Sequence, residues 1–316
     1  MARVEYDGFS CQLRSGESVL DGLLRAGVAV PHSCRAGSCG SCMMRAVAPS
    51  TATSRSQAGL KDSWKVRGYF LACVCHPDAD LAAGPVDAES RCGATIASLD
   101  RLSDSVLRVC LATATPLEYH AGQFITVFLP DGLARSYSVA SLPVEDVLEL
   151  HVRLLPGGRM SQWFAGQASV GDELQIQGPS GDCFYLAGRE DSPLLLAGTG
   201  TGLSPLYGIA RDALGHGHRG PIYLFHGAVT SAGLYLQDQL ERLGHAHPNF
   251  TYIPTTLEAG GPIDQAILTR FPELTGWRAF VCGDPVIVHS LKKKVFLAGA
   301  RLKDIHADAF VTAPAV

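Results

Sequence analysis

The stretch Cys34-Arg-Ala-Gly-Ser-Cys39-Gly-Ser-Cys42 places three of the chain's ten cysteines on one short loop with two glycines. Its spacing, C-x4-C-x2-C, is used by cysteines that hold a [2Fe–2S] cluster, and it requires a fourth cysteine farther along the chain. The residues between the cysteines are small, so the backbone can bend tightly and point its N–H groups toward the sulfur atoms. The stretch therefore predicts a cluster-binding loop.

The fourth ligand is expected in Leu71-Ala-Cys73-Val-Cys75-His-Pro77, where two cysteines are candidates. A structural zinc knuckle and a chance group of inert thiols are the alternatives for the whole set. Zinc sites usually pair C-x2–4-C with a second such pair or with histidines. A Rieske centre would use histidines in place of two cysteines, and neither His32 nor His76 forms a matching C-x-H pair. The spacing favours the [2Fe–2S] cluster.

The composition describes a globular protein. The chain has 316 residues, of which 47% are hydrophobic, enough for two or three domains. With 26 basic and 30 acidic residues, the net charge of −4 argues against a nucleic-acid partner or a polybasic membrane patch. The start, MARVEYDGFS, does not resemble a signal peptide, and no apolar run approaches the length of a membrane span. We therefore expect a cytoplasmic protein, and in that reducing compartment clustered thiols more often bind metal than form disulfides.

The chain divides into three segments by its pattern. In the first, two short strands lead to a helix that Ser18 and Asp21 cap and Gly27 ends. Residues 83–92 mix Gly, Pro and charge and are predicted to be a linker, with a boundary near residue 88. The second segment, to residue 187, has short alternating strands and one short helix near residues 160–165, typical of a small antiparallel barrel or sandwich.

From Pro193 the pattern changes to strands that alternate with helices. Apolar runs of strand length are followed by segments of helix length, which predicts a doubly wound α/β domain with a mostly parallel sheet. The expected helices cover residues 204–214, 234–243, 263–271 and 286–298.

The first segment resembles the plant-type ferredoxin family. The resemblance rests on H-S-C-R-A-G-S-C-G-S-C together with L-A-C-V-C-H-P-D-A-D-L some thirty residues later. In that family the last ligand follows a Leu and a small residue and precedes a Pro by four positions. The resemblance implies a β-grasp fold over residues 1–88, with Cys73 rather than Cys75 completing the set Cys34, Cys39, Cys42 and Cys73.

Two elements of the middle segment carry groups that can bind a pyrophosphate. Arg135-Ser-Tyr137-Ser138 places a cation and an aromatic ring on one face of a strand and a hydroxyl on the other. A guanidinium can bind a pyrophosphate with two hydrogen bonds. Gly157 and Gly158 open a short helix, and backbone N–H groups at such a helix start can bind an anion.

In this order the two elements resemble the motifs R-x-Y-S and G-G-x-x-S of the ferredoxin–NADP reductase superfamily. The resemblance implies that Arg135 and residues 157–161 hold the pyrophosphate of FAD. It also implies that Tyr137 packs on the isoalloxazine ring and that Ser138 lies near flavin N5. The expected FAD-binding residues are Arg135, Tyr137, Ser138, Val152, Arg153, Gly157, Gly158 and Ser161.

The third segment opens with a strand, a glycine loop and a helix, Leu194-Leu-Leu-Ala-Gly-Thr-Gly-Thr-Gly-Leu-Ser-Pro205. Glycines let a pyrophosphate approach the helix N-terminus, and proline suits a first helical turn. Pro205 replaces the last glycine of G-x-G-x-x-G, as in the reductase superfamily. The end of the second strand, residues 226–233, carries neither an acid for a ribose hydroxyl nor an Arg for a 2′-phosphate, so we favour NADH and keep NADPH open. The expected loop residues are Gly198, Thr199, Gly200, Thr201, Gly202 and Pro205.

Two further stretches resemble the reductase superfamily. Val281-Cys282-Gly283-Asp-Pro285 is similar to its C-G-x-P motif, which implies that Cys282 lies beside the nicotinamide and that Gly283 helps to bind it. Ile305-His-Ala-Asp-Ala-Phe310 is similar to the family's near-terminal segment, in which an aromatic ring shields the flavin, so Phe310 is a candidate for that role.

Across nearly the whole chain, the order of the motifs resembles the reductase components of bacterial multicomponent oxygenases. It implies a ferredoxin domain over residues 1–88, an FAD-binding β-barrel over 89–187 and an NAD(P)H-binding α/β domain over 188–316. NADH gives up two electrons as hydride and a cluster accepts one, so FAD must stand between them. Ser138 and Cys282 are the expected catalytic residues.

The expected acceptor is a Rieske-type aromatic-ring dioxygenase or its ferredoxin. A soluble di-iron monooxygenase is the alternative partner, and a nucleotide-binding redox sensor is the alternative of another class. Nucleic acid and membrane are not expected partners, and a monomer is favoured.

Overall fold

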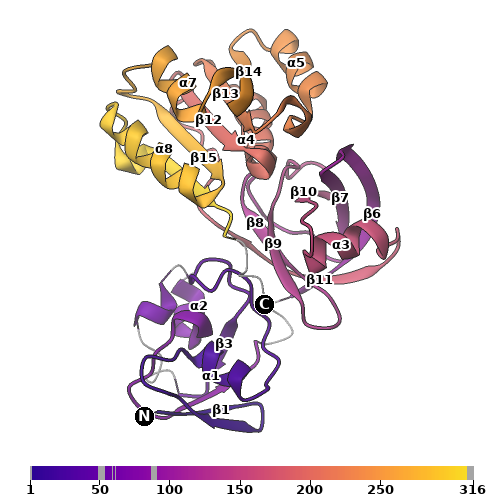
Figure 1. The fold of residues 1–316 in the computed structure, drawn as a ribbon, viewed down its shortest axis with the longest axis vertical. Coiled ribbons are helices and arrows are strands. Elements are labelled where there is room, and N and C mark those ends of the chain that lie inside the picture. Colours follow the sequence, from indigo (N-terminus) through magenta and orange to yellow (C-terminus); the bar gives the residue numbers. More distant parts are fainter. Residues whose placement is uncertain (1, 49–53, 59, 61, 87–90, 312–316) are drawn as a thin grey trace.

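The computed structural model describes residues 2–48, 54–58, 60, 62–86 and 91–311, which form three lobes, each around its own sheet (Figure 1). The indigo ferredoxin-like lobe contacts the magenta barrel, and the barrel contacts the orange and yellow α/β lobe (Figure 1). The predicted three-part fold is confirmed. The expected boundary at residue 88 lies outside the described residues, and residue 187 lies between the last barrel strand and the first α/β strand.

The first lobe has a five-stranded sheet in the order β2-β1-β5-β3-β4. Strands β1 and β5 are parallel, and the other pairs are antiparallel. Apolar residues of α1, among them Leu20 and Leu23, pack into a core with Met44 and Phe70, as in a β-grasp domain. The elements are β1 (Arg3–Tyr6), β2 (Phe9–Gln12), α1 (Val19–Arg25), β3 (Met43–Ala46), α2 (Asp62–Val66), β4 (Tyr69–Leu71) and β5 (Leu81–Gly84).

Local sequence signals explain how α1 starts, and they misplace one strand end. The Ser18 hydroxyl accepts a hydrogen bond from the Asp21 N–H at 3.2 Å, which confirms the predicted cap. The predicted linker over residues 83–92 begins too early, because Ala83 and Gly84 belong to β5. Ala83 pairs with Tyr6 and Gly84 with Arg45. The turn-forming composition was overridden there by pairing on both sides of the strand.

The second lobe is an antiparallel barrel with the strand order β10-β7-β6-β11-β8-β9. A bridge between Val139 and Leu150 joins its two end strands. Buried residues such as Val109, Ile125 and Val127 fill the interior. The elements are β6 (Cys92–Ser103), β7 (Val106–Thr113), β8 (Phe124–Phe128), β9 (Ala134–Ser138), β10 (Leu148–Arg153), α3 (Arg159–Gly166) and β11 (Glu173–Ser180).

The third lobe has a parallel sheet in the order β14-β13-β12-β15-β16, with helices on both faces (Figure 1). Strands β13 and β14 lie on one side of β12, and β15 and β16 lie on the other, so the strand order reverses there. A ligand crevice is therefore expected at the carboxyl ends of β12 and β15. The strands are β12 (Leu194–Thr199), β13 (Ile222–Ala228), β14 (Phe250–Thr256), β15 (Arg278–Gly283) and β16 (Ile305–Ala309). The helices are α4 (Leu203–Gly215), α5 (Gln237–Ala246), α6 (Leu257–Gly260), α7 (Ile263–Arg270) and α8 (Pro285–Leu297).

One predicted helix of this lobe starts later than expected. The pattern suggested a start at Leu234, but α5 begins at Gln237. Leu236 has a φ of 55°, in the left-handed region, and it breaks the helical path between a short 3₁₀ turn and α5. Among the described helices, none has both the length and the apolar character that a membrane crossing needs.

Candidate functional site

The predicted cluster ligands lie together as two pairs of thiols. The Cys34 and Cys39 thiols are in contact, and each residue's N–H donates to the other's Sγ at 3.4 Å. The Cys42 thiol contacts the Cys73 thiol. Two irons, each with two cysteine sulfurs, would need such a pairing. Within the described ranges, no set of three or more His, Cys, Asp or Glu side chains is arranged to hold a single metal ion.

The loop supplies N–H and O–H donors to the sulfur atoms. The Ala36 N–H and the Ser38 hydroxyl donate to Cys34 Sγ at 3.3 and 3.4 Å. The contact with the Cys39 thiol, together with these donors, lowers the pKa of Cys34 to about 4. Gly37 has a φ of 74°, which lets its N–H reach Cys73. The donors therefore favour the thiolate of Cys34, the form in which cysteine binds iron, while the contact with the Cys34 thiol and burial raise the pKa of Cys39.

The structure separates the two candidates for the fourth ligand by their surroundings. Cys73 is partly exposed beside Cys42 and Gly37. Cys75 is fully buried in the core of the first lobe, where its C=O accepts the Val19 N–H that begins α1. This arrangement supports Cys73 as the ligand and a packing role for Cys75.

The flavin motif lies on β9, the end strand of the barrel beside β8. Tyr137 packs edge-on against Phe164 of α3, with ring centroids 6.1 Å apart. Ser138 lies where the barrel meets the α/β lobe, and its carbonyl accepts a hydrogen bond from the Ser204 hydroxyl at 3.0 Å. Arg135 donates to the carbonyl of His32, in the first lobe, at 3.4 Å. Its guanidinium has five N–H donors, so this contact leaves others for a pyrophosphate.

The second flavin element forms a glycine turn at the start of α3. Gly157 has a φ of 70°, and a Cβ on Gly158 would lie 2.7 Å from the Ser161 hydroxyl. Gly158 provides no side-chain cap for the helix, so the first N–H groups of α3 can meet an anion. Val152 is buried in the barrel core, while Arg153 is exposed at the end of β10.

The nucleotide loop, which follows β12, lies directly against the backbone at the end of β15. A Cβ on Gly202 would lie 2.2 Å from the Cys282 carbonyl oxygen, and one on Gly198 would lie 2.6 Å from Leu206. Gly200 has a φ of 54° in the turn that leads into α4. Gly202 precedes α4 without a side-chain cap, and Pro205 lies in the first turn. The loop thus offers N–H groups to a phosphate at the crevice.

Strand β16, which pairs with β15, contributes an acidic side chain that the sequence analysis did not select. Asp308 on β16 pairs with Cys282 on β15, and its Oδ2 accepts the Ser138 hydroxyl at 3.2 Å. Although part of its side chain is exposed, burial raises the pKa of Asp308 to about 6, and the Ser138 bond opposes this shift. The Phe310 N–H donates to the Gly283 carbonyl at 2.8 Å, which holds this segment against the crevice.

Two further contacts near these sites could not have been found from short-range sequence signals. Cys183 Sγ lies 3.5 Å from Cys282 Sγ, and both thiols are buried. The Thr126 hydroxyl on β8 donates to the Cys39 carbonyl at 2.9 Å and joins the barrel to the cluster loop. Each pair is separated by more than 80 residues, so no spacing rule could have found it.

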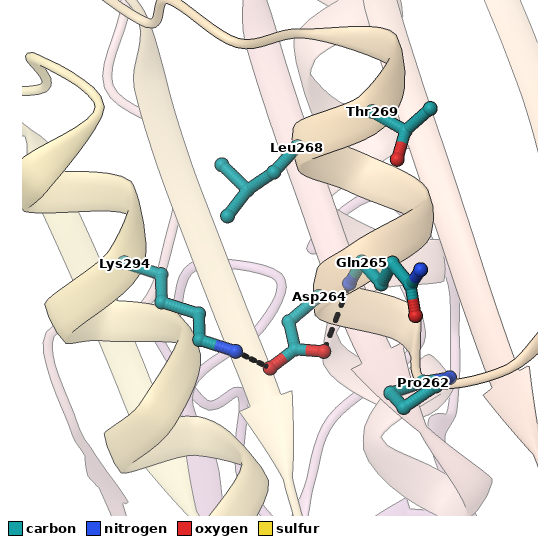
Figure 2. Close-up of a pocket in the computed structure, with 6 residues that line it drawn as sticks. All are labelled: Pro262, Asp264, Gln265, Leu268, Thr269 and Lys294. Atoms are coloured by element: carbon teal, nitrogen blue, oxygen red, sulfur yellow. Dashed lines mark hydrogen bonds and ion pairs between the residues drawn. The ribbon is translucent and has the colours of Figure 1, made fainter.

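A surface cavity between α7 and α8 lies outside these sites (Figure 2). Figure 2 shows the Lys294 ammonium pointing to the Asp264 carboxylate, with which it forms an ion pair. None of the lining residues belongs to the predicted cofactor sites. The lining residues are Pro262, Asp264, Gln265, Leu268, Thr269 and Lys294.

Comparisons with known proteins agree with the order of the three domains. A 2Fe-2S iron–sulfur cluster binding domain matches residues 3–78, an oxidoreductase FAD-binding domain matches 94–185, and an oxidoreductase NAD-binding domain matches 196–293. A ferredoxin–NAD(P)+ reductase component of the naphthalene 1,2-dioxygenase/salicylate 5-hydroxylase systems of Ralstonia sp. is 32% identical over 313 residues, which is 94% of either chain. The chain belongs to this family of oxygenase reductase components.

Other members of the reductase family are similarly close. The reductase subunit of an aromatic O-demethylase from an Amycolatopsis strain is 32% identical over 98% of both chains. The crystal structure of an Amycolatopsis cytochrome P450 reductase superposes with a TM-score of 0.70 at 30% identity, covering 98% of this chain and 99% of that one. The predicted [2Fe–2S], FAD and nicotinamide cofactors and the oxidoreductase activity are confirmed at the level of the family.

Proposed function

We propose that this reductase oxidises NADH and passes the electrons one at a time to a Rieske-type aromatic-ring dioxygenase or to its ferredoxin. The observation that carries the proposal is the meeting of all three lobes at the strand pair β8–β9. Ser138 on β9 contacts Asp308 and Ser204 of the α/β lobe, and Thr126 on β8 contacts the cluster loop. A cofactor held on this strand pair would therefore lie between the nicotinamide site and the cluster.

Each lobe has a separate task in this reaction. NADH gives up a hydride and a cluster accepts single electrons, so the two cannot react directly. Bound FAD would accept the hydride and release the electrons one at a time. Arg135 and the N-terminus of α3 would hold its pyrophosphate, and the N-terminus of α4 would hold the phosphates of the nicotinamide nucleotide. Ser138 of the barrel and Cys282 of the α/β lobe would orient the two reacting rings.

Ser138 and Asp308 are suited to handle the proton of this reaction. Oxidation of one NADH by two one-electron acceptors releases one proton overall. In the structure Ser138 Oγ donates to Asp308 Oδ2, a bond that fits the ionised carboxylate. Because the pKa of Asp308 is about 6, this carboxylate can accept a proton through Ser138 near neutral pH.

The acceptor is an oxygenase component by family resemblance, and its class is a proposal. A soluble di-iron monooxygenase stays the alternative to the Rieske-type dioxygenase. The Amycolatopsis relative is named a cytochrome P450 reductase, so a cytochrome P450 is a third class, which the sequence analysis did not consider. The relatives are named as reductases, which favours an enzyme over a nucleotide-binding redox sensor. The cytoplasmic location and the monomeric state stay predictions.

The purified protein should test the proposal directly. We expect a brown-yellow preparation whose flavin and [2Fe–2S] absorbance is bleached by NADH, and which reduces cytochrome c under turnover. Pairing it with a purified Rieske dioxygenase, a di-iron monooxygenase and a cytochrome P450 would separate the acceptor classes. A colourless, zinc-containing preparation without NADH oxidation would end the reductase hypothesis.

NADH should be the preferred nucleotide. After β13 the chain reads Val229-Thr-Ser-Ala-Gly233 and has no cation, and Val229 is 64% exposed. This segment offers no charge-assisted hydrogen bond to the 2′-phosphate of NADPH. We therefore expect kcat/KM for NADPH to be at least about tenfold lower than kcat/KM for NADH. Steady-state kinetics with both nucleotides measure the ratio.

A variant can localise this preference. Val229→Arg should raise kcat/KM for NADPH and so bring it closer to the value for NADH. The variant adds a guanidinium where the ribose 2′-phosphate is expected to bind. Val144→Arg, on an exposed loop of the barrel, is the matched control and should leave the ratio unchanged. A wild-type protein that prefers NADPH would show the NADH assignment to be wrong.

A further inference from the structure

One buried hydrogen bond connects the barrel directly to the peptide backbone of the cluster loop. Thr126 Oγ1 donates to the Cys39 carbonyl oxygen at 2.9 Å, and the Thr126 residue is only 2% exposed. The two residues are 87 positions apart and belong to different lobes. A hydrogen bond at the surface between two lobes would be exposed and could be replaced by bonds to water. This bond is instead buried between the two lobes.

A second hydroxyl fixes the direction of the first. Ser136 Oγ lies 2.9 Å from Thr126 Oγ1, and the two residues are paired in register between β8 and β9. A threonine hydroxyl has one proton, which Thr126 gives to the Cys39 carbonyl, so Ser136 must donate to Thr126. The result is a directed chain from Ser136 through Thr126 to Cys39.

This chain begins on the same strand face as the hydroxyl at the nicotinamide crevice. Ser136 and Ser138 are two residues apart on β9, so they face the same side, about 7 Å apart along the strand. Ser138 reaches the α/β lobe through Asp308, and Ser136 reaches the cluster loop through Thr126. One face of one strand thus contacts both the lobe where electrons enter and the loop from which they leave.

Other contacts surround the Thr126 bond at the same strand pair. Arg91 lies over the ring of Phe128 on β8, 3.9 Å from its centroid. Phe128 is two residues from Thr126 and shares its face. Arg135 of β9 donates to the His32 carbonyl just before the cluster loop. The Thr126 bond is the contact in this group that ends on a predicted ligand residue.

We propose that Thr126 is a positioning residue for electron transfer from the flavin to the cluster. It holds the peptide of Cys39 against β8, so that the cluster stays at a fixed place beside the strands that carry the flavin motif. Each transfer across this contact moves one electron and breaks no bond of the protein; two transfers complete the oxidation of one NADH. The inference rests on the proposed role of Cys39 as a cluster ligand.

The test compares Thr126→Val, which keeps the shape of the side chain and removes the hydroxyl, with Thr126→Ser, which keeps the hydroxyl. In the holoenzyme, amide hydrogen exchange of a peptide that covers residues 34–42 should quicken about five- to tenfold in Thr126→Val, the effect of losing one buried hydrogen bond. Stopped-flow reduction of the cluster by NADH should slow by about fivefold. Thr126→Ser should behave as the wild type, and Thr95→Val, on an exposed site of β6, is the matched control.

Three measurements make the outcome decisive. Cluster content and the EPR signal after chemical reduction should match the wild type in Thr126→Val, since no ligand is changed. Reduction of ferricyanide by NADH should also match, because the flavin motif is intact. Wild-type exchange and cluster reduction in Thr126→Val would overturn the proposal. A Cys39→Ser variant that keeps its cluster would instead contradict the ligand assignment on which it rests.

Discussion

Replacing Cys73 with serine should remove the [2Fe–2S] cluster, whereas replacing Cys75 with alanine should leave it in place. The Cys73 thiol contacts the Cys42 thiol, and its loss would leave one iron with a single cysteine ligand. Cys75 lies in the core with no exposed surface, so its loss affects packing rather than metal binding. Visible absorbance, iron content and EPR of the reduced protein measure the difference.

The two variants also differ in the reactions they should retain. Cys73→Ser should still reduce its flavin with NADH and transfer electrons to ferricyanide, but its reduction of cytochrome c should be lost. Cys75→Ala should keep both reactions and lose about 1 kcal/mol or more of folding free energy, because it leaves a small cavity. If Cys75→Ala empties the site and Cys73→Ser keeps the cluster, the ligand assignment is reversed.

Removing the Ser138 hydroxyl or the Asp308 charge should slow reduction of the flavin by NADH about 100-fold, because the hydroxyl, held by the carboxylate, would orient the reacting rings for hydride transfer. Ser138→Ala removes the group that joins the crevice to the carboxylate, and Asp308→Asn keeps the shape of the side chain without its charge. Anaerobic stopped-flow of the flavin absorbance, with FAD content measured beforehand, separates loss of chemistry from loss of the cofactor.

The pH dependence gives a second readout for the same pair. The pKa of Asp308 is raised by burial from 3.8 to about 6, so its carboxyl is protonated below that pH and ionised above it. The ionised form accepts the Ser138 hydrogen bond and so fixes the hydroxyl that would orient the reacting rings for hydride transfer, a step that itself releases no proton. The proton of NADH oxidation is released later, when the two electrons pass on to the cluster. In the wild type, kcat/KM for NADH should therefore rise as pH increases through about 6.

The limb near pH 6 should disappear in Asp308→Asn and persist in Asp146→Asn, which changes an exposed carboxylate on a barrel loop. A wild-type profile that is flat between pH 5 and 7, or an Asp308→Asn profile with the limb intact, would show that this carboxylate takes no part in the reaction.

Short-range signals in the sequence were sufficient for the three-part fold, for the cap of α1 and for the glycine turns. The Ser18–Asp21 cap, the glycine turn at Gly157 and the loop from Gly198 to Gly202 depend on the backbone geometry of a few neighbouring residues. A side chain at Gly198 would collide with Leu206 and with the backbone of Gly202, so its glycine follows from local space. Such constraints leave a direct trace in residue type and spacing.

The sequence by itself therefore determined the order of the domains and the cysteine, flavin and nucleotide motifs. Only the tertiary structure placed Cys73 beside Cys42 and Cys75 in the core, because burial depends on how the whole β-grasp lobe packs. It also joined Ser138 to Asp308, 170 residues later, and Thr126 to Cys39 in another lobe. Contacts between distant segments arise from the packing of lobes, which no local pattern of residues records.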